Sequence, residues 1–192
     1  DQYPEAIKNF LSEQQGKNLN IYINSGGGSV FAGIAIYNMI RRFAETNDVS
    51  VTVDGLAGSI ASVIAFAGNT PPKIPSNAFL MIHNPFALVE GNAADLRKMA
   101  DDLDVITTGI LNVYMEHVKE GVTEDQIRAL MDAETWLNGR DAAEYFDIET
   151  TESVAEIAAA SGGYVARARN VPKDIVIQWA AGAARNKTSD NQ

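Results

Sequence analysis

Short apolar runs that alternate with helical patterns constrain the fold of this chain more than any other feature. Strand-like runs occupy residues 19–23, 49–53 and 78–82, and a helical pattern follows each of the first two. Strands that alternate with helices form crossover units, so the pattern predicts an α/β fold with a largely parallel sheet. Ligands of such sheets bind at the carboxyl ends of the strands. Residues 26–28, Ser59 and His83 fall at these ends and are candidate functional residues.

The composition excludes several classes of protein. The chain has 192 residues, which fit one domain, and it has no Cys, so disulfides and thiolate metal sites are excluded. Two His and a net charge of −10 argue against a multi-histidine metal site and against nucleic-acid binding. No run of 18 apolar residues occurs, so we expect no membrane span. The chain begins without Met or a signal-peptide pattern, so we expect a processed or trimmed piece. The lack of Cys is compatible with a cytoplasmic location, and we expect no cofactor and no metal.

A long helix is predicted from Asn92 to near Gly121. Its apolar positions alternate in steps of three and four, which is the spacing of a heptad seam: Leu96, Met99, Leu103, Ile106, Ile110 and Val113. Such a helix would be roughly 40 Å long, more than a domain of this size needs. We therefore expect an arm that packs on a neighbouring subunit, with an intramolecular helix across the sheet as the alternative. His117 falls on the same seam and is assigned to an interface or the surface.

Two residues could together carry acyl transfer. Ser59 follows Gly58 at a strand-to-helix corner, and the N–H of Ile60 would point out of the helix start, where donors lack intrahelical partners. The alternative is that Ser59 is only a helix N-cap. His83 closes a strand and can accept and return a proton near neutral pH, although a histidine at a strand end is more often an ordinary polar residue.

The glycines at 26–28 do not form a nucleotide-binding motif. No Gly-Lys-Ser/Thr follows them, and Phe31 breaks the Gly-x-Gly-x-x-Gly pattern. A flexible turn remains, whose N–H groups can approach a ligand or an oxyanion. Ser29, directly after the turn, is a predicted helix N-cap, and residues 55–58 are predicted to form a second turn of small residues.

Several motifs in order and at near-equal spacing over residues 19–150 make the chain resemble the Clp protease proteolytic subunit (ClpP) family. They are residues 22–28 (Tyr-Ile-Asn-Ser-Gly-Gly-Gly), 55–61 (Gly-Leu-Ala-Gly-Ser-Ile-Ala), 81–85 (Met-Ile-His-Asn-Pro), 90–95 (Glu-Gly-Asn-Ala-Ala-Asp) and 136–145. The resemblance implies a ClpP/crotonase-like spiral of ββα units with a long protruding handle helix at about 92–120. Residues 1–150 would form the peptidase domain and residues 151–192 a C-terminal helical extension.

The resemblance also implies a function, that of a serine endopeptidase. Ser59 would be the nucleophile and His83 the general base, with the N–H groups of Gly28 and Ile60 as the oxyanion hole. The peptide would bind as an extended strand near Gly26, Gly27 and Ser29. Family members assemble into rings, so we expect a homo-oligomeric hexamer or heptamer, possibly stacked through the handle helix. Whether an unfoldase partner acts with it stays open.

The chain departs from the family pattern at the third member of the triad. Glu134 stands where the family has Asp, and we assign it as the acid, with Asp132 as the alternative. Gly26 stands where the family usually has Pro. The run 134–136 (Glu-Thr-Trp) and the segment after residue 150 resemble the phage head-maturation (prohead) branch. In that branch the substrate is scaffold or capsid protein, no unfoldase is needed, and the location is the prohead or the bacterial host cytoplasm.

Other functions are kept as alternatives. A housekeeping Clp-type degradative protease shares all the motifs. A crotonase-like acyl-CoA enzyme shares the spiral and the paired N–H groups but needs no Ser–His pair. A Ser–Lys peptidase would need a basic lysine near Ser59, and Lys73 is the nearest in sequence. A non-catalytic ring component has no physical requirement for both Ser59 and His83.

Overall fold

The structure is a computed structural model that describes residues 3–152. The predicted C-terminal extension therefore lies outside the described residues from 153 onward. The elements along the described chain are, in order, α1 (Tyr3–Glu13), β1 (Leu19–Ser25), α2 (Val30–Ala44), β2 (Val49–Gly58), α3 (Ile60–Ala65), β3 (Phe79–Ile82), α4 (Ala93–Met115), α5 (Glu124–Asp132), β4 (Thr135–Asn138) and α6 (Gly139–Tyr145).

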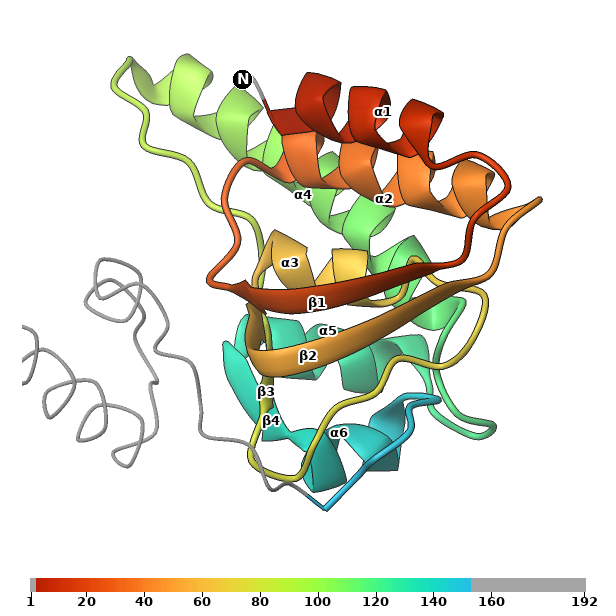
Figure 1. The fold of residues 1–192 in the computed structure, drawn as a ribbon. Helices are drawn as coiled ribbons and strands as arrows, with labels where there is room; N and C mark the ends of the chain where they lie inside the picture. Colours follow the sequence, from red (N-terminus) through yellow and green to blue (C-terminus); the bar gives the residue numbers. More distant parts are fainter. Residues whose placement is uncertain (1–2, 153–192) are drawn as a thin grey trace, which may run out of the picture.

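The strands form one sheet in the order β1-β2-β3-β4 (Figure 1). β1, β2 and β3 pair in parallel, which confirms the predicted α/β fold and largely parallel sheet. β4 was not predicted, and it pairs antiparallel to β3 with Ile82 opposite Thr135. Because β2 and β3 are neighbours in parallel, their carboxyl ends meet at one edge of the sheet.

The prediction of a turn at residues 55–58 is wrong, because β2 continues to Gly58. Leu56, Ala57 and Gly58 pair with the three residues Phe79, Leu80 and Met81 of β3. The β1–β2 register shifts between Ile23 and Ser25, and β1 pairs with β2 again at Ala57, which also pairs with β3. The small residues thus belong to a strand that lies between two partners, and the turn comes one residue later, at Ser59.

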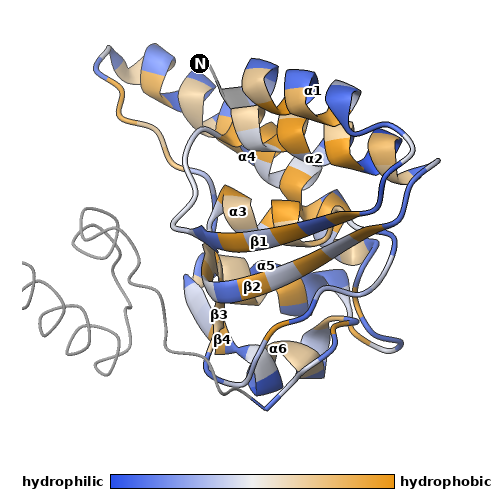
Figure 2. Ribbon diagram, in the orientation of Figure 1, coloured by the Kyte–Doolittle hydropathy of each residue, from blue (hydrophilic) through white to orange (hydrophobic). Residues whose placement is uncertain are grey.

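The core lies between the sheet and the helices that cover it. In Figure 1, α1 and α2 lie above β1 and β2 in the view, and α6 lies below them. α4 packs on α3 and α5, and α6 packs on β3 and β4. The buried residues of α2 recur at helical spacing: Gly33, Tyr37, Ile40, Phe43 and Ala44. Figure 2 shows hydrophobic residues concentrated on β1, β2 and α3, where the layers meet.

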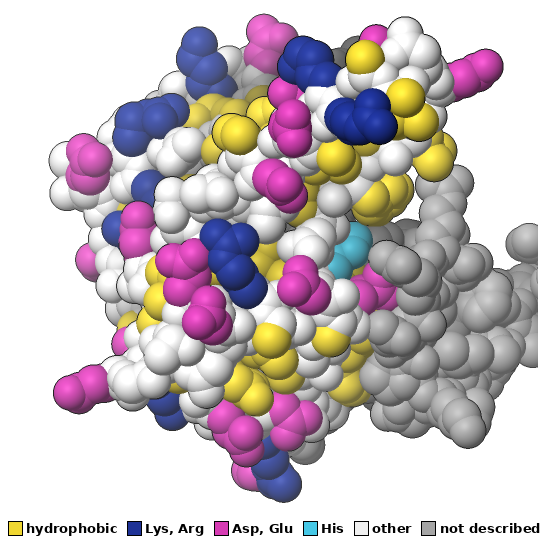
Figure 3. Space-filling model, turned by 180° about the vertical axis from the view of Figure 1, so that it is seen from behind, with side chains coloured by type: hydrophobic (Ala, Val, Ile, Leu, Met, Phe, Trp, Pro, Cys, Tyr) yellow, Lys and Arg dark blue, Asp and Glu magenta, His cyan; other side chains and the backbone are white. Residues whose placement is uncertain are grey.

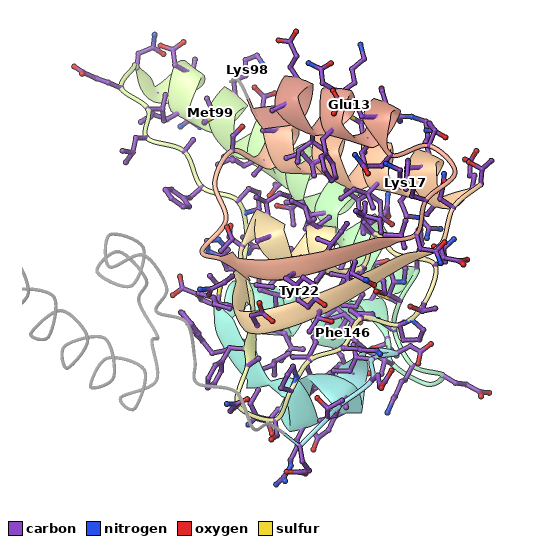
Figure 4. The ribbon with its side chains drawn as sticks, in the orientation of Figure 1. Glu13, Lys17, Tyr22, Lys98, Met99 and Phe146 are labelled. Carbon is purple, nitrogen blue, oxygen red and sulfur yellow. The ribbon has the colours of Figure 1, made fainter. Side chains whose placement is uncertain are left out.

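α4 begins as predicted and ends earlier than predicted. Asn92 caps it with a complete capping box, in which Asn92 accepts from the backbone of Asp95 and Asp95 accepts from that of Asn92. Its 23 residues span about 34 Å, and its first buried residue is Ile110. Lys98 and Met99 lie on the part that extends past the other helices (Figure 4). The first half of α4 thus protrudes from the fold, and its packing on a neighbouring subunit stays a prediction.

Contacts to the rest of the chain end α4 at Met115 rather than near Gly121. The chain turns at His117, whose carbonyl accepts from Asp147, and Val118 forms a bridge with Phe146. The ring of His117 stacks on Phe66 at 5.0 Å. His117 is thus half-buried within this chain, and its assignment to an interface or the surface stays a prediction. That burial lowers the pKa of His117, with a smaller contribution from Arg41.

Candidate active site

Ser59 occupies a sharp turn between β2 and α3. Its backbone has φ 54° and ψ −130°, a region that L residues rarely adopt. Its N–H donates to the carbonyl of Met81 at 2.8 Å, which fixes the turn against β3. Its side chain makes no capping hydrogen bond to α3. The alternative in which Ser59 serves only as an N-cap is therefore wrong.

His83 meets Ser59 across the ends of the two neighbouring strands. Gly58 pairs with Met81, so the residues that follow each strand emerge at the same edge of the sheet. His83 Nε2 lies 2.8 Å from Ser59 Oγ, at hydrogen-bond distance. The histidine side chain is only 12% exposed, so its ring is largely shielded from water. The hydroxyl and the imidazole are thus in contact, as the sequence predicted.

Glu134 is the carboxylate that reaches His83. It lies between α5 and β4 and is 8% exposed, and its Oε2 is 3.7 Å from His83 Nδ1. Asp132 is exposed and instead accepts a hydrogen bond at 2.7 Å from Asn84. The backbone of Glu134 has φ 50°, which turns the chain directly into β4, beside β3 and His83. Of the two predicted acids, the structure brings only Glu134 to the imidazole.

The glycine loop between β1 and α2 packs on the Ser59 turn. At Gly27, where φ is 96°, a Cβ would lie 2.7 Å from both the carbonyl oxygen of Gly58 and the Cβ of Ser59. The same Cβ would lie 3.2 Å from the backbone nitrogen of Ile60. Only glycine fits this close approach. Ser29 behaves as the predicted N-cap and accepts from the N–H of Ala32.

Three side chains near the site were not predicted. The Phe86 ring lies 6.1 Å from that of His83 and is 74% exposed. Ser62, one turn after Ser59 in α3, donates from its hydroxyl to the Ser59 carbonyl, and its Oγ lies 2.6 Å from the hydroxyl of Tyr114. The helical spacing of Ser62 could have indicated its approach to Ser59. No local signal connects it with Tyr114 on α4.

The described residues offer neither a metal site nor a membrane span. Figure 3 shows scattered acidic and basic side chains on one face, and a histidine side chain at the surface beside hydrophobic and acidic ones. Within residues 3–152, no group of three or more His, Cys, Asp or Glu could hold a metal ion. Across the same residues, no helix has the length and hydropathy that a membrane span requires.

The arrangement has the parts that acyl transfer by a serine needs. An imidazole that touches a hydroxyl can take its proton as the oxygen attacks a carbonyl. A buried carboxylate near the other ring nitrogen can orient the ring and stabilise its charged form. Free N–H donors beside the hydroxyl can stabilise the oxyanion that forms. A serine, a histidine and an acid in this order are the set that serine hydrolases with a Ser-His-acid triad use.

Comparison with known proteins gives the family. The Clp protease family model matches residues 6–149, and the chain belongs to this family. It is 32% identical over 136 residues to an ATP-dependent Clp protease proteolytic subunit of Bacteroides fragilis. It is 32% identical over 155 residues to proteolytic subunit 3 of Streptomyces coelicolor and 33% identical over 152 residues to proteolytic subunit 2 of Rhodococcus jostii.

The matches cover most of this chain and differ in how much of each relative they cover. They span 70% of this chain and 63% of the Bacteroides fragilis protein, which is less than two thirds of that relative. They span 79% of this chain and 70% and 76% of the Streptomyces coelicolor and Rhodococcus jostii proteins. All three relatives carry the name of a proteolytic subunit.

Proposed function

We propose that the protein is a serine endopeptidase in which Ser59 is the nucleophile and His83 the general base. Glu134 orients the imidazole and stabilises its positive charge, and the N–H groups of Ile60 and Gly28 bind the oxyanion. Ser59 Oγ attacks the scissile carbonyl while its proton passes to His83 Nε2, which then protonates the leaving amine. Water hydrolyses the acyl-enzyme in a second step of the same kind.

One observation carries this proposal, the 2.8 Å contact between Ser59 Oγ and His83 Nε2. It is made by a serine in a strained backbone conformation that a mere helix cap does not require. Sparsely populated conformations persist only where surrounding contacts hold them, and they cluster at functional sites. The proteolytic names of the relatives support the same reaction.

The position of the glycine loop supports the assignment of the peptide-binding edge. β1 is an edge strand of the described sheet, and residues 26–29 continue it past the Ser59 turn. An extended peptide paired with Gly26, Gly27 and Ser29 would carry its carbonyl across Ser59. The N–H of Gly28 comes from this loop and that of Ile60 from the turn beneath it, so the proposed oxyanion hole takes its two donors from separate segments.

The other reactions fit the described geometry less well. A Ser–Lys mechanism needs a lysine at Ser59, but Lys73 pairs with Glu149 at 3.9 Å and bridges to Thr52 within the lower part of the fold. A crotonase-like acyl-CoA reaction uses two backbone N–H donors but has no need for the Ser59–His83 contact. A non-catalytic subunit would not need Ser59 to be held at positive φ.

The test measures cleavage of a fluorogenic peptide and labelling by a fluorophosphonate probe. The wild-type protein is expected to do both, and Ser59→Ala is expected to lose at least about 10³-fold in kcat and all labelling. Ser50→Ala is the matched control, because its hydroxyl contacts only Asn20 far from the site. Equal activity of the wild type and Ser59→Ala, or acyl-CoA turnover by both, would refute the proposal.

The biological role is the finer part of the proposal. We infer an oligomeric ring with the protruding half of α4 at its contacts, and cleavage of phage scaffold or capsid protein by the cytoplasmic enzyme. The run from Glu134 to Trp136 supports the phage branch, while a housekeeping Clp role fits the family equally well. Mass measurement in solution tests the ring. Cleavage of a folded scaffold protein without ATP or an ATPase favours maturation, whereas a strict need for both favours the degradative role.

A further inference from the structure

Two buried hydroxyls, those of Ser62 and Tyr114, form a chain that ends at the nucleophile turn. Ser62 on α3 is 0% exposed and Tyr114 on α4 is 1% exposed. Their oxygens lie 2.6 Å apart, and the Ser62 hydroxyl also contacts the carbonyl oxygen of Ser59. The same carbonyl oxygen accepts the N–H of Ser62 at 2.9 Å. The chain of two hydroxyls therefore ends on one backbone group, the Ser59 carbonyl.

The donor and acceptor of each hydrogen bond follow from the number of hydroxyl protons, because each hydroxyl has only one. A carbonyl oxygen can only accept, so the single hydroxyl proton of Ser62 goes to the Ser59 carbonyl. The contact between Ser62 and Tyr114 then needs the proton of Tyr114. Tyr114 donates to Ser62, and Ser62 donates to Ser59. Hydrogen bonds in such a series polarise one another in the same sense.

The Ser59 carbonyl belongs to the same peptide unit as the N–H of Ile60. A peptide unit is planar, and its carbonyl and N–H point in opposite directions. Contacts that hold the carbonyl oxygen inside the protein therefore hold the N–H of Ile60 outward, on the side of the site. Rotation of this one peptide plane would turn the N–H away from the substrate while Ser59 Oγ stayed near His83. The Ser59–His83 contact alone does not prevent that rotation.

We propose that Ser62 and Tyr114 are positioning residues that keep the Ile60 N–H directed at the developing oxyanion. The inference rests on the proposed function and adds two residues to it. The hydroxyl chain opposes rotation of the Ser59–Ile60 peptide plane, which would change ψ of Ser59 from its −130°. It also draws charge from the Ser59 carbonyl, which makes the Ile60 N–H a stronger donor.

Tyr114→Phe is the sharpest test, because it removes one oxygen and keeps the ring. The ring packs on Phe66 and Phe146 at centroid distances of 6.4 and 5.8 Å, and these contacts persist in the variant. Complete loss of an oxyanion donor costs about 10²–10³-fold in kcat. A donor that is misdirected part of the time should cost about tenfold, with KM nearly unchanged, since a donor to the oxyanion acts mainly in the transition state.

A peptide aldehyde separates this role from a general loss of structure. Ser59 Oγ adds to the aldehyde carbon, its proton passes to His83, and the carbonyl oxygen becomes an oxyanion that needs the Ile60 N–H. The inhibition constant of the aldehyde should rise by the same factor as kcat falls. The dissociation constant of the matching peptide alcohol, which has no carbonyl at that position, should not change. Tyr37→Phe is the control, since its buried hydroxyl contacts His117 instead.

Ser62→Ala and the double variant test the order of the chain. Tyr114 acts through Ser62, so Ser62→Ala with Tyr114→Phe should be no slower than Ser62→Ala alone. Additive losses would overturn the chain, as would unchanged kcat in Tyr114→Phe or an unchanged aldehyde inhibition constant. If Ser62→Ala does not fold, Tyr114→Phe and the aldehyde decide alone. If the wild-type protein has no peptidase activity, the proposed function itself is refuted, which is a different outcome from the ones above.

Discussion

Replacement of Glu134 by glutamine tests the triad assignment most directly. The change keeps the size of the side chain and removes the charge that faces His83 Nδ1 at 3.7 Å. A carboxylate and an imidazolium at 3.7 Å attract by about 4 kcal/mol at an effective dielectric constant of about 20. Each 1.36 kcal/mol is tenfold in rate, so kcat should fall by up to about 10³-fold.

The assay is kcat on a fluorogenic peptide, with two further variants beside Glu134→Gln. Asp132→Asn is the matched control, since it removes an exposed carboxylate two residues away that contacts only Asn84 in the described hydrogen-bond network. It should lower kcat only slightly. Glu134→Asp keeps the charge one methylene further from His83 and should retain more activity than Glu134→Gln.

The opposite ranking would refute the reasoning. If Asp132→Asn lost activity about 10³-fold while Glu134→Gln kept it, Asp132 would be the acid. The carboxylates would then have to rearrange around His83 when substrate binds. If both variants kept full activity, the imidazole would need no carboxylate. Thermal unfolding of each variant, measured with the kinetics, separates loss of catalysis from loss of fold.

Three more predictions follow from the same turn and from the core. Gly27→Ala should lower kcat by about 10²-fold or more, because its Cβ would push on Gly58 and Ser59 at 2.7 Å; retained activity in a folded variant would contradict the close approach. Ser59→Gly should be more stable than Ser59→Ala by about 1 kcal/mol in urea unfolding, since glycine tolerates φ of 54°. Burial lowers the pKa of His117, so the unfolded chain binds a proton at this imidazole more readily than the folded protein does. Wild-type stability should therefore fall below about pH 6.5, and the difference in urea midpoint between pH 7.5 and 5.5 should shrink in His117→Gln.

The strands and helices that were predicted correctly share strong local signals. β1 and β3 have apolar runs, α2 has helical spacing, and the capping boxes of α4 and α5 begin with Asn92 and Thr123. α1 was not predicted, although its apolar residues Ile7, Phe10 and Leu11 recur at helical spacing. Phe10 is 46% exposed while the adjacent Leu11 is 6% exposed. Burial there is set by packing on α2 and not by the local sequence.

β4 was missed for a different reason. It has four residues and pairs with β3, whose carboxyl end precedes it by more than 50 residues of chain. Its residues, Thr135–Asn138, carry too short an alternation to indicate a strand. The pairing is favourable only because β3 already presents an open edge in the fold.

The contact between Ser59 and His83 was predictable from the sequence, whereas the choice of the acid and the link between Ser62 and Tyr114 were not. The motifs around Ser59 and His83 placed two turns at the same edge of a parallel sheet, and their contact follows from that topology. The choice between Glu134 and Asp132 depends on the single backbone rotation at which α5 ends, which no residue pattern encodes. The link between Ser62 and Tyr114 joins residues 52 positions apart through tertiary packing alone.

Backbone strain and function coincide in this molecule. Among the described residues, the non-glycine positions with positive φ are Ser59 and Glu134, at the two ends of the Ser-His-Glu arrangement. Sequence analysis assigned both residues to the triad, and both adopt a backbone conformation that local propensity disfavours. The N–H of Ser59 is held by Met81, two residues before His83 on β3. The strand that delivers the imidazole therefore also holds the strained serine. Changes that displace β3 should move both groups together and preserve their contact better than changes to either turn.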